Sequence, residues 1–308
     1  MSQTYQELLE DVKRDNTSGA WVVAQKAINC LQELTKEKSN VEFSELIAEV
    51  QRVVGEILKA QPNMSQLVNL FNGILFTVEN ETSNDALVLS RKIAGEARRF
   101  EEQSKKAVTR VAEVGAELIA QDSVVLTHSN SSTILEILRR AQQDGKSFEV
   151  IVTESRPACE GRERARELSK LGIPNLYLVD AAICLGIERA DLVLLGADSV
   201  SETTLVNKIG TRAICLAARE ALVACYAACE SSKFIPERLT AKKEPLRDPA
   251  EVWPDPPAET SIQNCYVEHT PLELFTGLIS EEGIFTPEEM GSKIRAHKMN
   301  RKLIQMLK

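Results

Sequence analysis

From residue 121 onward the chain alternates short apolar runs with amphipathic helical segments, and this alternation limits the fold more than any other feature. The apolar runs lack polar alternation, so both of their faces should be buried, as in a parallel sheet covered by helices on both sides. The pattern predicts a doubly wound α/β domain with its ligand site at the carboxyl ends of the strands. The expected strands are 123–127, 148–153, 175–179, 191–197 and 222–228, with a sixth in 262–269, and the expected helices are 132–145, 160–172 and 208–220.

The first 120 residues have a helical pattern instead. Apolar residues of 64–78 recur at a spacing of three and four, and a similar stripe continues through 84–120, which indicates one long helix. We therefore expect an N-terminal α-helical domain over 1–120 and a Rossmann-like α/β domain over 121–308. The segment 244–259 is rich in proline and acidic residues and is expected to be an irregular excursion.

Composition narrows the class of protein and of partner. The 308 residues carry a net charge of -8, which argues against a large nucleic-acid interface because such interfaces need clustered Lys and Arg. No apolar run is long enough to span a membrane, the seven cysteines form no C-x-x-C pair, and the N-terminus does not resemble a signal peptide. These features predict a cytoplasmic protein without membrane contact.

The sequence also lacks the motifs of several common sites. There is no G-x-G-x-x-G after the first strand and no phosphate-binding loop motif, which argues against a dinucleotide cofactor. The three histidines, His128, His269 and His297, are far apart and lack metal-ligand spacing. We expect neither a cofactor nor a metal.

Polar residues follow every expected strand, and in a parallel sheet these ends meet at one edge. Amide groups at a helix start, together with Arg and Lys side chains, bind phosphate, and carboxylates bind hydroxyls or transfer protons. The alternative is that these residues have only structural roles: Ser and Asn before a helix are common N-caps, and a lysine at a helix start can be solvated. The predicted ligand-binding residues are His128, Ser129, Asn130, Ser131, Arg156, Asp198, Asn207 and Lys208.

These strand ends resemble the signature of a known family. The segments 126-LTHSNSS-132, 152-VTESRPACEG-161, 179-VDAA-182, 196-GADSV-200 and 207-NKIGT-211 are similar, in order and spacing, to those of the translation initiation factor 2B α/β/δ superfamily. The resemblance implies a helical domain ahead of a Rossmann-like domain. It also implies one of two functions: aldose–ketose isomerase acting on methylthioribose 1-phosphate or ribose 1,5-bisphosphate, or regulatory translation-factor subunit.

The sequence departs from the isomerase pattern at three positions. The isomerases carry a cysteine where this chain has Ser129, and that cysteine and the aspartate matching Asp198 form their acid–base pair. A thiol with a pKa of about 8.5 exchanges protons near neutral pH, whereas a serine hydroxyl is a far weaker acid. Ser18 and Gln61 stand where the isomerases have arginines that hold phosphate.

These departures favour a non-catalytic or regulatory binder of a phosphorylated sugar or nucleotide. The alternative is a sugar-phosphate isomerase in which Asp198 is the main acid–base residue and Ser129, or a nearby cysteine such as Cys159 or Cys184, assists it. The resemblance further implies a homodimer or larger oligomer, with a translation factor as a candidate partner.

Overall fold

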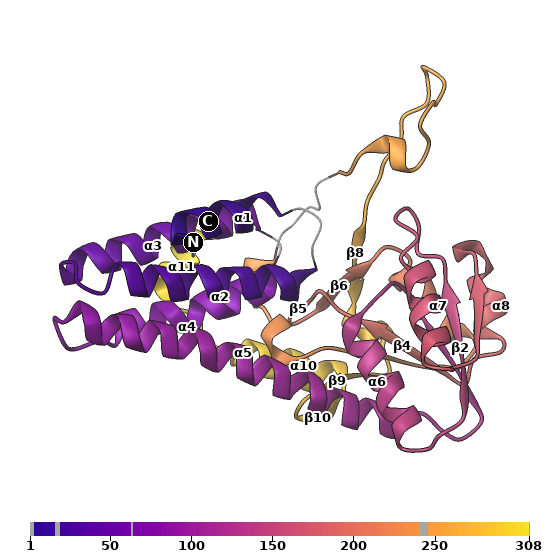
Figure 1. Ribbon diagram of the computed structural model, residues 1–308. Coiled ribbons are helices and arrows are strands. Elements are labelled where there is room, and N and C mark those ends of the chain that lie inside the picture. Colours follow the sequence, from indigo (N-terminus) through magenta and orange to yellow (C-terminus); the bar gives the residue numbers. More distant parts are fainter. Residues whose placement is uncertain (1–2, 16–18, 63, 241–245, 308) are drawn as a thin grey trace. The chain divides into compact units, whose positions relative to one another are not determined.

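The computed structural model describes residues 3–15, 19–62, 64–240 and 246–307 (Figure 1). The chain forms two compact units. The helical unit comprises Met1–Lys106, Ser232–Ala241 and Ala296–Lys308, and the α/β unit comprises Ala107–Ser231 and Lys242–Arg295. The long helix α5 (Ala86–Glu117) contributes to both units. After residue 120 the chain therefore returns twice to the helical unit, which the sequence pattern did not indicate.

The helical unit is held together by the apolar faces of its helices. Its buried core includes Leu31, Ile57, Phe71 and Ile74, and the returning segments add Ile235 and Leu303 to it. Burial of each of these last two side chains stabilises the fold by about 1.5–3 kcal/mol, which explains why the late segments belong to this unit. The helices are α1 (Tyr5–Arg14), α2 (Ala20–Glu37), α3 (Phe43–Ala60), α4 (Ser65–Glu79), the first part of α5, and α11 (Arg301–Met306).

The α/β unit contains the predicted parallel sheet. Its strand order is β10-β9-β7-β4-β1-β2-β3; all neighbours pair in parallel except β9 and β10, which are antiparallel. The predicted fold class is confirmed. The strands of this sheet are β1 (Ser123–Thr127), β2 (Phe148–Thr153), β3 (Asn175–Leu178), β4 (Leu192–Gly196), β7 (Ala224–Ala228), β9 (Gly277–Ser280) and β10 (Gly283–Phe285).

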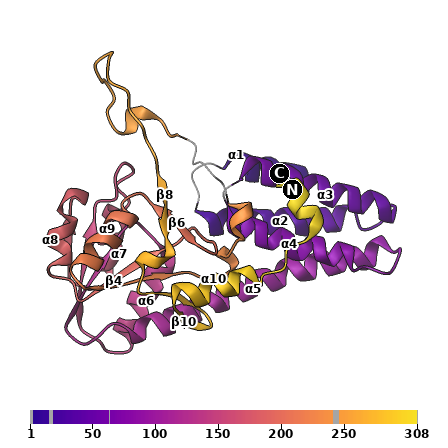
Figure 2. The same cartoon turned by 180° about the vertical axis from the view of Figure 1, so that it is seen from behind.

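Both faces of the sheet are covered, as continuous apolar strands require. Val125 and Val150 belong to a core with Ile137 of helix α6. On the opposite face Leu126 and other sheet side chains lie against Gly186 of helix α8. Figures 1 and 2 show the helices around the sheet from two sides. The helices of this unit, besides the end of α5, are α6 (Ser132–Gln143), α7 (Gly161–Lys170), α8 (Ile183–Ile187), α9 (Thr211–Glu220) and α10 (Pro287–Arg295).

A second, three-stranded sheet lies in the same unit. Its order is β5-β6-β8, with both pairs antiparallel; the strands are β5 (Ser199–Val200), β6 (Thr204–Lys208) and β8 (Val267–Pro271). The strand expected in 262–269 is therefore found in part as β8, but outside the parallel sheet. The segment before β8, which holds the predicted irregular excursion, extends away from both sheets in Figure 2. Residues 241–245, where that excursion begins, lie outside the described residues.

Candidate functional site

The loops after β1 and β2 have an unusual backbone conformation. Ser129 has a φ of 67° and Ser155 a φ of 63°, a left-handed region that costs a non-glycine residue about 1–3 kcal/mol. Hydrogen bonds hold both positions: the Ser129 N–H donates to Ser155 Oγ at 2.8 Å, and the Ser155 N–H donates to Asp180 Oδ1 at 2.7 Å. The strand ends are thus fixed to one another by specific side chains, an arrangement typical of functional sites.

His128 joins this edge to the turn after β6. Its side chain is buried, and its Nε2 lies 2.8 Å from the carbonyl oxygen of Ile209, so Nε2 must carry a proton and donate. Nδ1 is then the acceptor for the hydroxyls of Thr153 and Ser155, the latter at 3.2 Å. Burial lowers the pKa of His128, which agrees with a neutral ring. Both ring nitrogens have protein partners, so His128 positions the loops around it.

Two glycines allow the backbones at this edge to approach closely. A Cβ on Gly161, at the start of α7, would lie 1.9 Å from the Thr153 carbonyl oxygen at the end of β2. Gly210 has a φ of 105°, and a Cβ there would lie 3.0 Å from Nε2 of His128. Any side chain at either position would push apart the segments that surround Ser129.

A polar network that the strand-end pattern did not indicate connects Ser129 to Lys208. The Ser129 hydroxyl donates to Oε2 of Glu160, the residue just before α7. Oε1 of the same carboxylate accepts from Lys208 Nζ at 3.1 Å. The Lys208 side chain is only 4% exposed, and its ammonium lies 4.6 Å from the centre of the Tyr266 ring, within the range of a cation–π contact. Glu160, Ser129 and Lys208 thus form one connected group.

Asp198 directly precedes β5 and Asn207 lies on β6, the two strands of one antiparallel hairpin. Asp198 lies between β4 and β5 and is exposed; its N–H donates to the Val206 carbonyl oxygen of β6 at 2.8 Å. Asn207 is buried and donates from Nδ2 to Thr211 Oγ1 at 2.9 Å. Asn207 and Lys208 stand on a strand, although the sequence placed Lys208 at the start of a helix. The site therefore contains an exposed aspartate and, on β6, a buried asparagine and a buried lysine that is paired with Glu160.

The remaining predicted residues take different positions. Ser131 caps α6 by accepting from the Ile134 N–H, so its ordinary N-cap role is present, and Asn130 before it is exposed. Arg156 is also exposed, and its guanidinium donates to the Val252 carbonyl oxygen at 3.3 Å, toward the segment before β8. Arg156 therefore does not take part in the Ser129–Glu160–Lys208 network, and its role as a phosphate ligand stays a prediction.

The start of α9 is occupied by a carboxylate of the chain itself. Oε1 of Glu268 accepts from the Gly210 N–H at 2.8 Å and from the Arg212 N–H at 2.9 Å, at the start of α9. A carboxylate at a helix N-terminus is stabilised by the same amides and dipole that would bind a phosphate. The start of α9 is therefore not available to a phosphate.

The two positions where arginines were expected lie in the helical unit. Ser18 lies outside the described residues. Gln61 is buried, and its Nε2 donates to the carbonyl oxygens of Val12 at 3.0 Å and Asp15 at 2.8 Å. The amide of Gln61 thus ties two segments of the helical unit together, which is a structural role.

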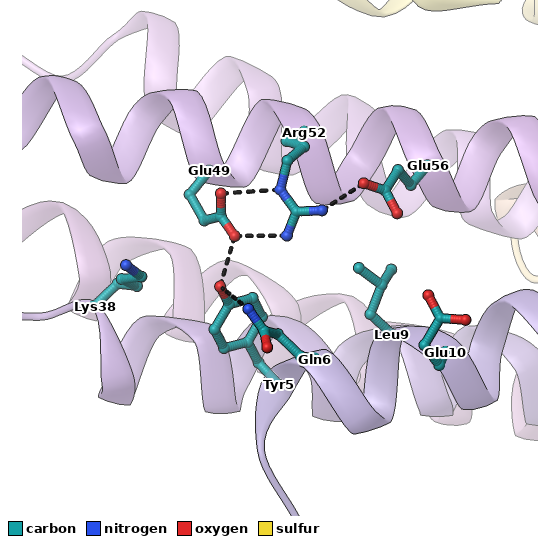
Figure 3. Close-up of a pocket in the computed structure, with 8 residues that line it drawn as sticks. All are labelled: Tyr5, Gln6, Leu9, Glu10, Lys38, Glu49, Arg52 and Glu56. Carbon is teal, nitrogen blue, oxygen red and sulfur yellow. Dashed lines mark hydrogen bonds and ion pairs between the residues drawn. The ribbon is translucent and has the colours of Figure 1, made fainter.

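The helical unit contains a separate polar hollow (Figure 3). Arg52 of α3 lies between Glu49 and Glu56, donating to Glu49 Oε1 at 2.6 Å, and the Tyr5 hydroxyl of α1 donates to the same Glu49 oxygen at 2.6 Å. The Arg52 guanidinium lowers the pKa of Glu49 to about 2. The polar groups of this hollow satisfy each other across two helices, so the network stabilises their packing.

Neither a metal site nor a membrane span is evident in the part of the chain that the structure describes. Within that part, no three His, Cys, Asp or Glu side chains gather in a way that could hold a metal ion. No helix within it is long and apolar enough to cross a membrane. The expectation of a protein without metal or cofactor stays a prediction.

Comparisons with known proteins identify the family. The model of the initiation factor 2 subunit family matches residues 16–287. The ribose 1,5-bisphosphate isomerase of Thermococcus kodakarensis is 31% identical over 291 residues, covering 91% of this chain and 90% of that protein. A translation initiation factor eIF-2B subunit 2-like protein of Pyrococcus horikoshii is 32% identical, covering 91% of this chain and 96% of that protein.

The solved structures agree with the sequence comparison. The crystal structure of the Pyrococcus horikoshii translation initiation factor eIF-2B superposes with a TM-score of 0.77 at 30% identity, covering 93% of this chain and 98% of the other. The match extends over both units, and the predicted resemblance is confirmed. The chain belongs to the initiation factor 2 subunit family.

Proposed function

We propose that this protein is an aldose–ketose isomerase acting on a sugar phosphate of the ribose 1,5-bisphosphate type. The replacement of the thiol by Ser129 favours a non-catalytic binder, but the relatives support the alternative. Ribose 1,5-bisphosphate isomerases of Thermococcus kodakarensis and Pyrococcus furiosus are 31% and 32% identical to this chain over nine-tenths of its length. Identity at this level over nearly whole chains is compatible with a shared reaction class.

The observation that carries the proposal is the exposed carboxylate of Asp198. It follows β4 at the carboxyl edge of the parallel sheet, where ligands of doubly wound folds bind. An aldose–ketose isomerase must move protons between two neighbouring carbons and their oxygens, and a carboxylate is suited to this task. A pure scaffold would have no chemical need for a carboxylate at this point.

The neighbouring residues supply binding groups. In the proposed complex the substrate phosphate lies at the start of α6, near Ser129, Asn130 and Ser131, where helix amides are available to an anion. Lys208 and Asn207 hold substrate oxygens from the β6 side. A homodimer or larger oligomer and a cytoplasmic location complete the proposal.

A regulatory binder, similar to the eIF-2B-like relatives, is the second candidate, and two observations favour it. Position 129 holds a hydroxyl, and Gln61 uses its amide for backbone carbonyls within the helical unit. In this candidate the same strand-end site binds a phosphorylated sugar or nucleotide without converting it.

A two-step experiment separates the candidates. A thermal-shift panel of sugar phosphates and nucleoside monophosphates identifies ligands, and NMR of each stabilising sugar phosphate measures conversion to its ketose. The isomerase proposal expects conversion that Asp198→Asn reduces by roughly 100-fold or more. Stabilisation without conversion would favour the regulatory binder, and a panel without any stabilising compound would contradict both.

A further inference from the structure

The replacement of a thiol by Ser129 leaves a chemical gap in the proposed reaction. Isomerisation needs one group that removes a proton from C2 and returns it to C1, and a second that exchanges protons with the oxygens. Asp198 can supply one of the two. A serine hydroxyl cannot supply the other near neutral pH without a base, because it holds its proton far more strongly than a thiol.

Glu160 lies where the missing group is needed. Its Oε2 accepts from the Ser129 hydroxyl, and its Oε1 accepts from Lys208 Nζ at 3.1 Å. The Glu160 side chain is 33% exposed, whereas that of Lys208 is 4% exposed. The carboxylate is therefore held in place by two donors while part of its surface stays open to a ligand.

The geometry points to Glu160 as the second acid–base residue, with Ser129 and Lys208 as the residues that position its carboxylate. This inference rests on the isomerase function proposed above. It assigns a catalytic role to a residue that is not among the predicted site residues, and it explains how a chain with serine at position 129 can move a carbon-bound proton.

The reaction balances with two carboxyl groups. Starting from the ring form of an aldose 1-phosphate, Glu160 takes the C2 hydrogen as a proton, and the electron pair of that bond forms the C1=C2 double bond. Asp198 enters this step as the protonated carboxylic acid and Glu160 as the carboxylate; the bond from C1 to the ring oxygen breaks, and the ring oxygen takes the proton of Asp198. Glu160 then returns its proton to C1, while the C2 hydroxyl gives its proton to Asp198 and becomes the ketone. Both carboxyl groups end as they began, and no oxidant or reductant is consumed.

A purely electrostatic role for Glu160 makes a different prediction. If the carboxylate only neutralised Lys208, its removal would release a buried cation for a substrate phosphate. Binding would then tighten and turnover would persist. Substitution by glutamine distinguishes the two roles, because it keeps the size and an acceptor while it removes the negative charge and the ability to take a proton.

The test uses the full chain with ribose 1,5-bisphosphate. NMR measures its conversion, and the shift in melting temperature measures its binding. Glu160→Gln is compared with Glu163→Gln, a matched control on the exposed side of α7 whose partner is Arg166 at 3.1 Å. The double variant Ser129→Cys/Glu160→Gln places a thiol at position 129, where the isomerases have their cysteine. Circular dichroism and the melting temperature without ligand report folding of each variant.

We expect Glu160→Gln to lower kcat by roughly 100-fold or more with KM within about threefold, and Glu163→Gln to behave as wild type. The double variant should have a kcat at least about tenfold higher than that of Glu160→Gln, since a thiol can take over the proton transfer. Unchanged kcat in Glu160→Gln, or no recovery in the double variant, overturns the assignment while the isomerase function stands. Absence of conversion by the wild-type chain overturns the isomerase function itself.

Discussion

Two polar networks of this molecule resemble each other in composition and differ in how the backbone presents them. In the helical unit Arg52, Glu49 and Tyr5 project from regular helices (Figure 3). In the α/β unit Ser129 and Glu160 stand on loops after strands, and Ser129 has a left-handed φ of 67°. Regular helices hold the first network without backbone strain, whereas the second is held against it. Strain that the surroundings enforce is expected where the arrangement serves a ligand.

The largest effect should come from crowding the strained network. In Gly161→Ala the new Cβ would meet the Thr153 carbonyl oxygen at 1.9 Å, so β2 or α7 must move. Overpacking of this kind costs about 1–3 kcal/mol and occasionally more, and we expect about 3 kcal/mol because the obstacle is backbone. Urea unfolding measures the loss. A change below about 0.5 kcal/mol would mean that the two segments are not held as closely as described.

Removal of one cation from each network should separate function from packing. Lys208→Met should lower turnover of a sugar phosphate by roughly 100-fold, because the carboxylate of Glu160 loses its buried partner. Arg52→Met removes a partly exposed ion pair, which is worth about 1 kcal/mol or less after solvent screening, and should leave turnover unchanged. Turnover rates and unfolding free energies of both variants check this contrast. A loss of turnover in Arg52→Met as large as that in Lys208→Met would contradict it.

The buried histidine of the strand-end network should make stability depend on pH. Burial lowers the pKa of His128, so below its unfolded value of about 6.5 the unfolded chain binds the proton more readily than the folded one. Stability from the neutral ring is complete above that pH and is lost as the pH falls through the folded pKa. His128→Gln should weaken this dependence and cost about 2 kcal/mol at neutral pH through unsatisfied hydroxyls. The free energy of unfolding measured at several pH values tests this prediction. An equal dependence of that free energy on pH in wild type and His128→Gln would refute it.

The smallest effect, of opposite sign, is expected in the helical unit. Gly55 lies within α3, and a Cβ there would meet nothing within 4 Å. Alanine is favoured over glycine in a helix by about 1 kcal/mol, so Gly55→Ala should stabilise the chain by up to that amount. The melting temperature measures the gain. Destabilisation would show that this face of α3 is more crowded than the structure indicates.

Much of the fold could be predicted because local patterns and the sheet agree. The continuous apolar runs at 123–127 and 148–153 became β1 and β2 with those same bounds. The stretch Thr204–Lys208 could not be recognised as a strand, since its asparagine and lysine stand before a helix pattern and its pairing partner β8 lies some sixty residues later. Long-range antiparallel pairing leaves little local signal.

Part of the candidate site is visible in the sequence. Residues that follow strands, such as Ser129 and Asp198, are visible as polar clusters after apolar runs. Glu160 lies within the segment 152–161 but was not singled out, because in the sequence it is one more acidic residue at the start of a helix, where acidic residues are common. Only the turn at Ser155 and the close approach at Gly161 bring its carboxylate to the Ser129 hydroxyl. Glu268 was missed for a similar reason, since it reaches the start of α9 only through the β6–β8 pairing.

Whether the strained strand-end network performs isomerisation can be measured by phosphorus-31 NMR of ribose 1,5-bisphosphate incubated with the protein. We expect the wild-type chain to replace the substrate signals with those of the corresponding 2-ketose, and Asp198→Asn to bind the substrate with conversion slowed by roughly 100-fold or more. Signals that stay unchanged with wild-type protein, while the same compound raises its melting temperature, would show that the protein binds the sugar phosphate without isomerising it.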